Sequence, residues 1–228
     1  MKERIIKYKG KAIDVFFTVD RCTHVSECVR GAPEVFNPLR TPWIDADAAD
    51  PDKVAEVVMR CPTGALHFRR KDNGFEETIP DKNQIDVCKS GPLWIKGDIE
   101  IRNYDDTLVL EDTRIALCRC GSSKIKPLCD NGHMFTFRDQ SEFIQRKIDE
   151  KEERGKLMIT LNQNGPYALS GPIEIRELNG AILFRGRQVI LCRCGASKKM
   201  PFCDGSHQRI HFKTDRKIVL INRKNDSL

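Results

Sequence analysis

Long apolar runs are missing from this sequence, and no window approaches the roughly 18 apolar residues that mark a membrane-spanning helix. The segment from Met1 to Lys11 is charged and lacks the apolar stretch of a secretory leader, so we expect none. Aromatic residues make up only 7% of the chain and apolar residues 39%, whereas charged residues make up 32%. These figures predict a cytoplasmic protein without a membrane anchor, built from small units whose apolar cores need further support.

Signatures of common enzyme sites are missing as well. The chain has no Rossmann glycine fingerprint, no phosphate-binding loop and no nucleophile elbow, so we expect no enzyme and no catalytic residues. Basic residues number 39 and acidic residues 33, but the two signs are interleaved and no basic block stands out. We therefore expect no nucleic-acid partner and no membrane partner.

Cysteine is the residue type that the composition does supply, with ten copies. In a reducing cytosol, thiols serve as metal or cluster ligands more often than as disulfides. Cys88 stands alone in an apolar segment, so we expect it to be a core residue without a ligand role. The other cysteines fall into three groups, which are taken in turn below.

Two segments of the chain repeat each other. Residues 91–133 align with residues 165–207 at a constant offset of 74 without a gap, and 18 of the 43 aligned pairs are identical. Such similarity indicates an internal duplication. Apolar runs punctuated by Gly and Pro predict strands at 93–101, 107–117, 168–175 and 181–191.

Each repeat ends in three cysteines and one histidine. A C-x-C pair in an extended loop directs two sulfurs to one metal ion, whereas a cysteine and a histidine four residues apart share one face of a helical turn. Three thiolates and an imidazole also form a zinc site, although structural zinc sites typically begin with C-x(2–4)-C, so the ligand types leave both metals open. The candidate ligands are Cys118, Cys120, Cys129 and His133 in the first repeat, and Cys192, Cys194, Cys203 and His207 in the second.

The second set lies in residues 192–207, CRCGASKKMPFCDGSH, which match the signature of the CDGSH iron-sulfur domain family at every specified position. Residues 118–133 resemble it at all four ligands and depart from it at Asn131 and Gly132. The resemblance implies a [2Fe-2S] cluster in each repeat, with two cysteines on one iron and a cysteine and a histidine on the outer one. Because mitoNEET-like members pair two copies of one motif, it also implies a soluble monomer whose tandem repeats form an intramolecular pseudo-dimer.

Basic residues flank both ligand loops. One interpretation is that they offset the negative charge of a cluster and raise its reduction potential; the other is that they are ordinary solvated surface. Both interpretations stay open. The residues are Arg119 and Lys124 in the first repeat and Arg193 and Lys198 in the second.

The first 70 residues carry a different pattern. Asp50-Pro51 is a signal for a helix N-terminus, and the valines at 54, 57 and 58 predict one apolar face on a helix over 51–60. Cys22, Cys28 and Cys61 follow the order of ferredoxin ligands, but Val25 occupies the place of the second ligand in the C-x2-C-x2-C run.

This segment resembles the divergent single-cluster ferredoxin-like domains of bacteria over about residues 5–70, through CTHVSEC, PWI and CPTGAL. The resemblance implies a [3Fe-4S] or a [4Fe-4S] cluster on Cys22, Cys28 and Cys61, with His24 as a candidate fourth ligand. Three buried structural thiols without a cluster are the alternative.

Together these observations predict a β-rich α+β protein. We expect a ferredoxin-like domain at 1–70, a linker at 71–84, a first CDGSH module at 85–137, a charged linker or helix at 138–156 and a second CDGSH module at 157–228. The expected function is electron transfer or delivery of a cluster, with a redox or cluster-acceptor protein as the partner. A zinc-stapled interaction module is the alternative.

Overall fold

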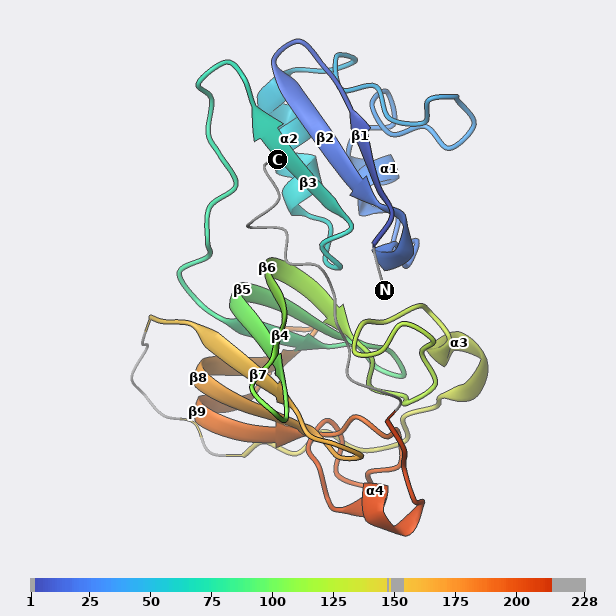
Figure 1. The fold of residues 1–228 in the computed structure, drawn as a ribbon, viewed down its shortest axis with the longest axis vertical. Helices are drawn as coiled ribbons and strands as arrows, with labels where there is room; N and C mark the ends of the chain where they lie inside the picture. The colour runs from blue at the N-terminus through green and yellow to red at the C-terminus, as the bar shows by residue number, and fades with distance from the viewer. Residues whose placement is uncertain (1–2, 147, 149–153, 215–228) are drawn as a thin grey trace. The chain divides into compact units, whose positions relative to one another are not determined.

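The computed structural model describes residues 3–146, 148 and 154–214. These residues form two compact units, one over residues 3–78 and the other from Ile79 onward, and each unit is described by itself (Figure 1). Within the described residues, no helix is long and apolar enough to cross a membrane.

The N-terminal unit contains a three-stranded antiparallel sheet in the order β1-β2-β3. Two helices follow β2 in the chain before β3 completes the sheet (Figure 1). The strands were not predicted, because their apolar residues do not alternate cleanly with polar ones. The elements are β1 (Ile5–Tyr8), β2 (Ile13–Thr18), the 3-10 turn η1 (Val19–Arg21), α1 (Glu27–Gly31), α2 (Pro51–Met59) and β3 (Leu66–Arg70).

Helix α2 lies where the sequence predicted a helix, and it ends one residue earlier than expected. The Asp50 carboxylate accepts a hydrogen bond from the Asp52 N–H at 2.9 Å, which satisfies one of the free donors of the first turn. Val54, Val57 and Val58 are fully buried and pack against apolar side chains of β2 and β3. This cluster is the core of the N-terminal unit.

A buried carboxylate links three segments of this unit. Lys7 and Lys71 each place Nζ 2.9 Å from a carboxylate oxygen of Asp14, and the Gly10 N–H donates to it at 3.2 Å. Burial by itself would raise the pKa of Asp14, but the hydrogen bonds from Lys71, Lys7 and Gly10 outweigh it and lower the pKa. A carboxyl with a lowered folded pKa stabilises the fold above its unfolded pKa of about 3.9, and this stabilisation is lost as pH falls through the folded pKa.

Replacing Asp14 with asparagine is therefore expected to lower the free energy of unfolding of this unit by about 1–3 kcal/mol at pH 7. The difference from wild type should shrink at an acid pH below the folded pKa of Asp14, where the wild-type carboxyl also loses its charge. Urea titrations at both pH values, followed by hydrogen exchange of the β2 amides, measure it. Glu56→Gln on the exposed face of α2 is the control. A loss of equal size at both pH values would contradict the prediction.

The second unit is built on a six-stranded sheet to which both repeats contribute. The four predicted strands are present. Strands β4 and β7 were not predicted, because each is short and precedes the aligned part of its repeat. The elements are β4 (Gln84–Val87), β5 (Leu93–Asn103), β6 (Leu108–Leu117), α3 (His133–Thr136), β7 (Leu157–Leu161), β8 (Tyr167–Glu177), β9 (Ile182–Leu191) and α4 (Ser206–Arg209).

The two repeats exchange strands within this sheet. Strand β4 of the first repeat pairs in parallel with β8 of the second, and β7 of the second pairs in parallel with β5 of the first. The registers of the two parallel pairs are equivalent. Gln84 lies opposite Glu174, and Met158 lies opposite Glu100. Adding 74 to Gln84 gives Met158, and subtracting 74 from Glu174 gives Glu100. Apolar residues of all six strands form one core, so neither repeat has a core of its own.

The segment between the repeats contains no helix in its described part, residues 138–146, 148 and 154–156. The alternative of a helix at 138–156 is wrong for these residues, and residues 147 and 149–153 lie outside the described ones. Instead, the Arg146 N–H donates to the Leu183 carbonyl at 2.7 Å, and Ile148 forms an isolated parallel bridge to Arg185. The backbone here finds its hydrogen-bond partners on β9 rather than within a helix.

Candidate metal centres

The predicted ligands of each repeat lie together as two pairs. In the first repeat the Sγ atoms of Cys118 and Cys120 are 3.6 Å apart, and Cys129 Sγ is 3.4 Å from His133 Nδ1. In the second repeat the Cys192 and Cys194 sulfurs are 3.7 Å apart, and Cys203 Sγ is 3.5 Å from His207 Nδ1. The two repeats thus present the same ligand geometry.

Main-chain hydrogen bonds hold these pairs next to each other. The first cysteine of each C-x-C pair follows the last strand of its repeat, and its N–H donates to Pro127 O or Pro201 O at 2.8 Å. The third cysteine is tied back to the same strand, because the Cys129 N–H donates to Ala116 O at 2.9 Å and the Cys203 N–H to Ile190 O at 3.0 Å. Each site is therefore built on the end of a rigid strand, as precise ligand positioning requires.

The aspartate of each motif shapes the ligand loop. In the second repeat, the Asp204 carboxylate accepts hydrogen bonds from the Lys198 and Ser206 N–H groups, each at 2.9 Å. Asp130 accepts the equivalent bonds from Lys124 and Gly132 in the first repeat, at 2.8 and 2.9 Å. Each aspartate closes a turn around the third cysteine of its motif.

The departure from the family signature at Asn131 leaves this loop intact. Gly205 has a φ of +84° and Asn131 has a φ of +70°, so both adopt the left-handed conformation. Asparagine tolerates this region better than other side chains because its short amide hydrogen-bonds locally. The N–H groups of Asn131 and Gly205 both donate to the sulfur of the preceding ligand, at 3.4 and 3.5 Å.

The thiols of each C-x-C pair share a proton. The thiol that keeps its hydrogen donates it to the other sulfur, which raises the pKa of one member and lowers that of the other. Burial raises the pKa of Cys129 to about 11, and the nearby Cys120 charge adds to the rise. Thiolates form in such a site when a metal replaces the protons.

The predicted ligands of each site lie at the separation of two ligands on one metal ion within each pair. Two ligands on one tetrahedral ion at about 2.3 Å lie roughly 3.8 Å apart, which is close to the separation within each pair. One zinc ion would bring all four ligands to that mutual distance. However, residues 3–146, 148 and 154–214 contain no group of three or more His, Cys, Asp or Glu side chains close enough to hold one metal ion. In the described residues, the donors of each site are therefore grouped as two pairs rather than around one point.

The two ligand loops contact each other across the repeats. A Cβ atom added to Gly195, whose φ is +82°, would lie 2.5 Å from the Cys120 carbonyl oxygen. A Cβ atom added to Gly121, whose φ is +77°, would lie 2.8 Å from the Cys194 carbonyl oxygen. Glycine is required here both by the left-handed backbone and by the closeness of the opposite loop.

Gly195→Ala is expected to reduce the iron and sulfide bound at both repeats, because the new methyl group displaces the Cys120 backbone as well as its own. We expect a loss of roughly 2–4 kcal/mol in unfolding free energy, from backbone strain and steric overlap together. Gly180→Ala is the matched control, since its φ is +92° but nothing lies within 4 Å of an added Cβ. Iron and sulfide analysis of the two variants measures the effect, and equal contents would contradict it.

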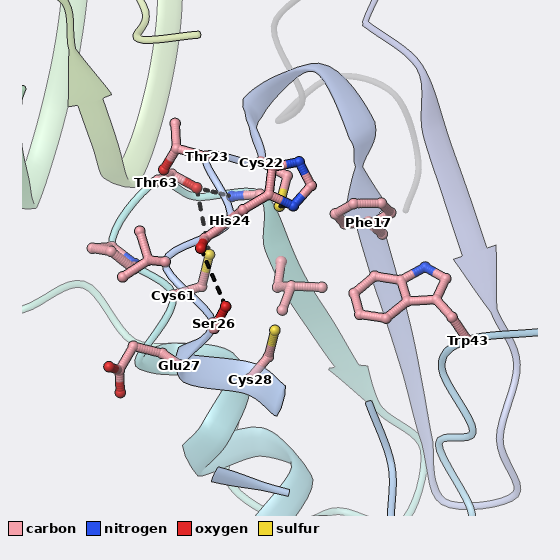
Figure 2. Close-up of a pocket in the computed structure, with 14 residues that line it drawn as sticks. Phe17, Cys22, Thr23, His24, Ser26, Glu27, Cys28, Trp43, Cys61 and Thr63 are labelled. Atoms are coloured by element: carbon pink, nitrogen blue, oxygen red, sulfur yellow. Dashed lines mark hydrogen bonds between the residues drawn. The ribbon is translucent and has the colours of Figure 1, made fainter. Parts of the chain in front are cut away.

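The predicted ligands of the N-terminal unit line one hollow of about 350 Å³, part of it open to solvent. Figure 2 shows the sulfur atoms of Cys22, Cys28 and Cys61 around this hollow, with Phe17 and Trp43 as an apolar wall. Three thiols from separate segments thus converge where the sequence predicted a cluster.

These three thiols are close enough to influence one another. Burial raises the pKa of Cys28 to about 11, and the charges of Cys61 and Cys22 add to the rise. His24 also lines the hollow, and its Nδ1 lies 4.0 Å from Cys22 Sγ. Val25, in the place of the missing ligand, lines the same hollow and offers no donor atom. The side-chain donors around this hollow are therefore three thiols, with the imidazole of His24 beside them.

Several residues near the sites were not singled out from the sequence. Thr63 places its hydroxyl 3.5 Å from Cys61 Sγ. The Tyr167 hydroxyl, which comes from the second repeat, donates to the Cys118 carbonyl of the first at 2.8 Å. The repeat alignment could have indicated Tyr167, because it aligns with Leu93 and so places a hydroxyl group where the other repeat has an apolar side chain. Cys88 is buried, and burial raises its pKa, with smaller contributions from the charges of Arg119 and Cys129.

Family models match both parts of the chain. Residues 8–71 match the model described as a divergent 4Fe-4S mono-cluster, and residues 90–134 and 164–208 each match the model described as an iron-binding zinc finger of CDGSH type. The chain contains a divergent 4Fe-4S mono-cluster domain followed by two CDGSH domains. Both resemblances drawn from the sequence are thereby confirmed, and the CDGSH repeats and the mono-cluster domain are iron-sulfur-binding domains.

The curated relatives divide in the same way. The mono-cluster domain is similar to the protein YjdI of Escherichia coli strains K12 and O157:H7, with 45% identity over 64 residues, which cover 28% of this chain and 84% of YjdI. The CDGSH region is similar to CDGSH iron-sulfur domain-containing protein 2 homolog A of Branchiostoma floridae, with 28% identity over 83 residues. That match covers 36% of this chain and 58% of the relative. No solved structure matches the chain.

Proposed function

We propose that this protein is an iron-sulfur carrier with one [2Fe-2S] cluster in each CDGSH repeat and a third cluster in the mono-cluster domain. The observation that carries the proposal is the pairwise spacing of the ligands, 3.4–3.7 Å within each pair, with no group of three ligands around one point in the described residues. In each repeat the C-x-C pair would hold one iron, and the third cysteine with the histidine would hold the other.

The exposure of the ligands supports exchange with a partner. Cys118 and Cys192 are each only 1% exposed, whereas His133 and His207 are half-buried. Cys120 and Cys194 are partly exposed as well, so a partner can approach each site from the histidine and from the second cysteine of the C-x-C pair. In electron transfer, one electron enters from a one-electron donor protein and leaves to a one-electron acceptor protein, with no bond made or broken in the chain.

Delivery of a whole cluster is the second candidate function, and the half-buried histidine of each site favours it as well. A neutral histidine is a weaker ligand for a cluster than a thiolate, and a half-buried histidine lets an acceptor thiol approach the outer iron. The two functions differ in what leaves the protein. Mixing the loaded protein with an apo acceptor and measuring the iron in each after separation distinguishes them.

The CDGSH region acts as an intramolecular pseudo-dimer in this proposal, so that the chain works as a monomer. Its support is the strand exchange between the repeats, in which both crossing pairs have the same register at the offset of 74. The contact of Gly121 and Gly195 with the opposite ligand loops is equally reciprocal. A second chain is then not needed to complete either site.

In the mono-cluster domain, Cys22, Cys28 and Cys61 would hold a [3Fe-4S] or a [4Fe-4S] cluster. The description of the matching family favours the four-iron type, in which one iron takes His24 or a small ligand. The apolar wall of Phe17 and Trp43 would shield one side of the cluster and lower the local dielectric, which helps to set its potential.

Metal and sulfide analysis of the full chain, purified without oxygen, tests the proposal. We expect two irons and two sulfides for each CDGSH repeat, with further iron and sulfide from the mono-cluster domain. Cys28→Ser should remove only that further fraction, and Cys88→Ser, which changes a buried thiol outside the sites, should remove none. A colourless protein that contains zinc but no sulfide would overturn the proposal and leave a zinc-stapled module.

A further inference from the structure

The two CDGSH sites differ in the charge buried beside them. Arg119 stands between the two cysteines of the first C-x-C pair and Arg193 between those of the second, and they are 1% and 2% exposed. A guanidinium keeps its charge even when it is buried. Water screens a buried charge only weakly, so each arginine acts on whatever the adjacent ligands hold.

In the first repeat this charge is compensated. The Arg119 guanidinium pairs with the Asp139 carboxylate, and both side chains are 0% exposed. It also donates to the backbone carbonyls of Gly91 and Cys88, and it lies over the Phe137 ring with its central carbon 5.1 Å from the ring centre. The first site therefore has a buried ion pair beside it, with no net charge.

In the second repeat, the described residues place no carboxylate against this charge. Arg193 donates one hydrogen bond, from Nη1 to the Asn162 carbonyl at 3.3 Å, and lies 5.3 Å from the centre of the Tyr167 ring. Its Nε is buried without a hydrogen-bond partner. Among the described residues, none of the groups that Arg193 contacts is a carboxylate.

A single replacement accounts for this difference. The Asp139 N–H donates to Ser90 Oγ at 3.0 Å, and the Thr214 N–H donates to Asn164 Oδ1 at 2.8 Å. Ser90 and Asn164 are equivalent at the offset of 74, and both have a positive φ, of +53° and +50°. Thr214 thus occupies the place of Asp139. Asp139 lies six residues after His133 and Thr214 lies seven residues after His207, because the second repeat has one more residue in this segment.

The exposed charges near the ligand loops act in the same direction. Each loop has two lysines and one aspartate, so these contribute equally. The residue two positions after the histidine is Phe135 in the first repeat, where it is 88% exposed, and Arg209 in the second. Arg209 therefore adds a positive charge beside the second ligand loop at a position where the first loop has none.

We infer that Arg193 gives the second CDGSH site a higher reduction potential than the first, so that one electron added to the pair resides at the second site. Reduction adds a negative charge, which an uncompensated buried cation stabilises and a neutral ion pair does not. The inference rests on the proposed function, since it needs a cluster at each site. We expect a difference on the order of tenfold in the reduction equilibrium, which is about 59 mV for a one-electron couple.

Redox titration of the full chain with dithionite and mediators, followed by visible absorbance, tests the inference. Wild type should show two CDGSH midpoints, and the higher one should be missing in Cys203→Ser. Thr214→Asp, which restores the carboxylate, should lower the higher midpoint toward the other. Thr214→Asn is the control of equal shape without charge and should leave it unchanged. Asp139→Asn should raise the lower midpoint, because it leaves Arg119 without its counter-ion.

The possible results separate this inference from the proposed function. Iron and sulfide are measured on the same samples, and their absence would overturn the proposed function itself. If both clusters are present but titrate at one midpoint, the inference is wrong and the carrier function stands. The inference is equally wrong if Thr214→Asp and Thr214→Asn shift the higher midpoint by the same amount. Should Thr214→Asp fail to fold, the Asp139→Asn shift decides by itself.

Discussion

Cys203→Ser is expected to abolish the iron and sulfide of the second CDGSH site and to leave those of the first. Cys203 lies 3.5 Å from His207 Nδ1, and its pKa responds to the Cys192 charge, so its ligand partners come from its own repeat. A serine hydroxyl does not ionise at neutral pH and is a poor ligand for the soft iron of a cluster. About half of the sulfide held by the two CDGSH sites should therefore be lost.

The reciprocal variant Cys129→Ser should remove the first site and leave the second. Cys88→Ser is the matched control, because Cys88 is a buried thiol of the same unit with no ligand partner in the site. Acid-labile sulfide and iron are measured for all three proteins and compared with wild type. Loss of both sites in either ligand variant would show that the contact between Gly195 and the Cys120 backbone makes the sites depend on each other.

His207→Cys is expected to slow the acid-driven loss of the second cluster. The coordinating nitrogen of an imidazole must be free of its proton, so protons compete with iron for His207, whereas thiolates bind the softer cluster more firmly. Because free histidine titrates near pH ~6.5, loss from wild type should accelerate below roughly pH 6–7, by at most about tenfold for each pH unit. At the changed site, most of this acceleration should disappear.

The same variant should lower the reduction potential of the second site, because an anionic ligand replaces a neutral one. The measurement is the decay of visible absorbance against pH for wild type, His207→Cys, His133→Cys and the double variant. The exposed His211→Ala, in the turn after α4, is the control for changes in surface charge. Identical decay in all of these proteins would remove both histidines from the coordination of the clusters.

Much of the site chemistry was readable from residue spacing alone. Three cysteines and a histidine at the same intervals in two repeats specify which side chains meet, because both pairs are local in sequence and need only a loop and one helical turn. The fourth ligand of the N-terminal site was not readable in this way. Cys22 and Cys61 come from distant segments, and Val25 removes the local pattern that normally identifies a ferredoxin.

The sequence by itself determined the duplication, the two ligand sets and the helix at Pro51, since each of these depends on neighbours within a few residues or on direct comparison of two segments. Only the tertiary structure decided how the repeats are joined, because β4 and β7 pair with strands of the opposite repeat and show no distinct pattern of their own. It alone also revealed that Thr214 stands where Asp139 stands in the other repeat. One extra residue after His207 hides that equivalence from an ungapped alignment, whereas the hydrogen bonds to Ser90 and Asn164 align the two positions in space.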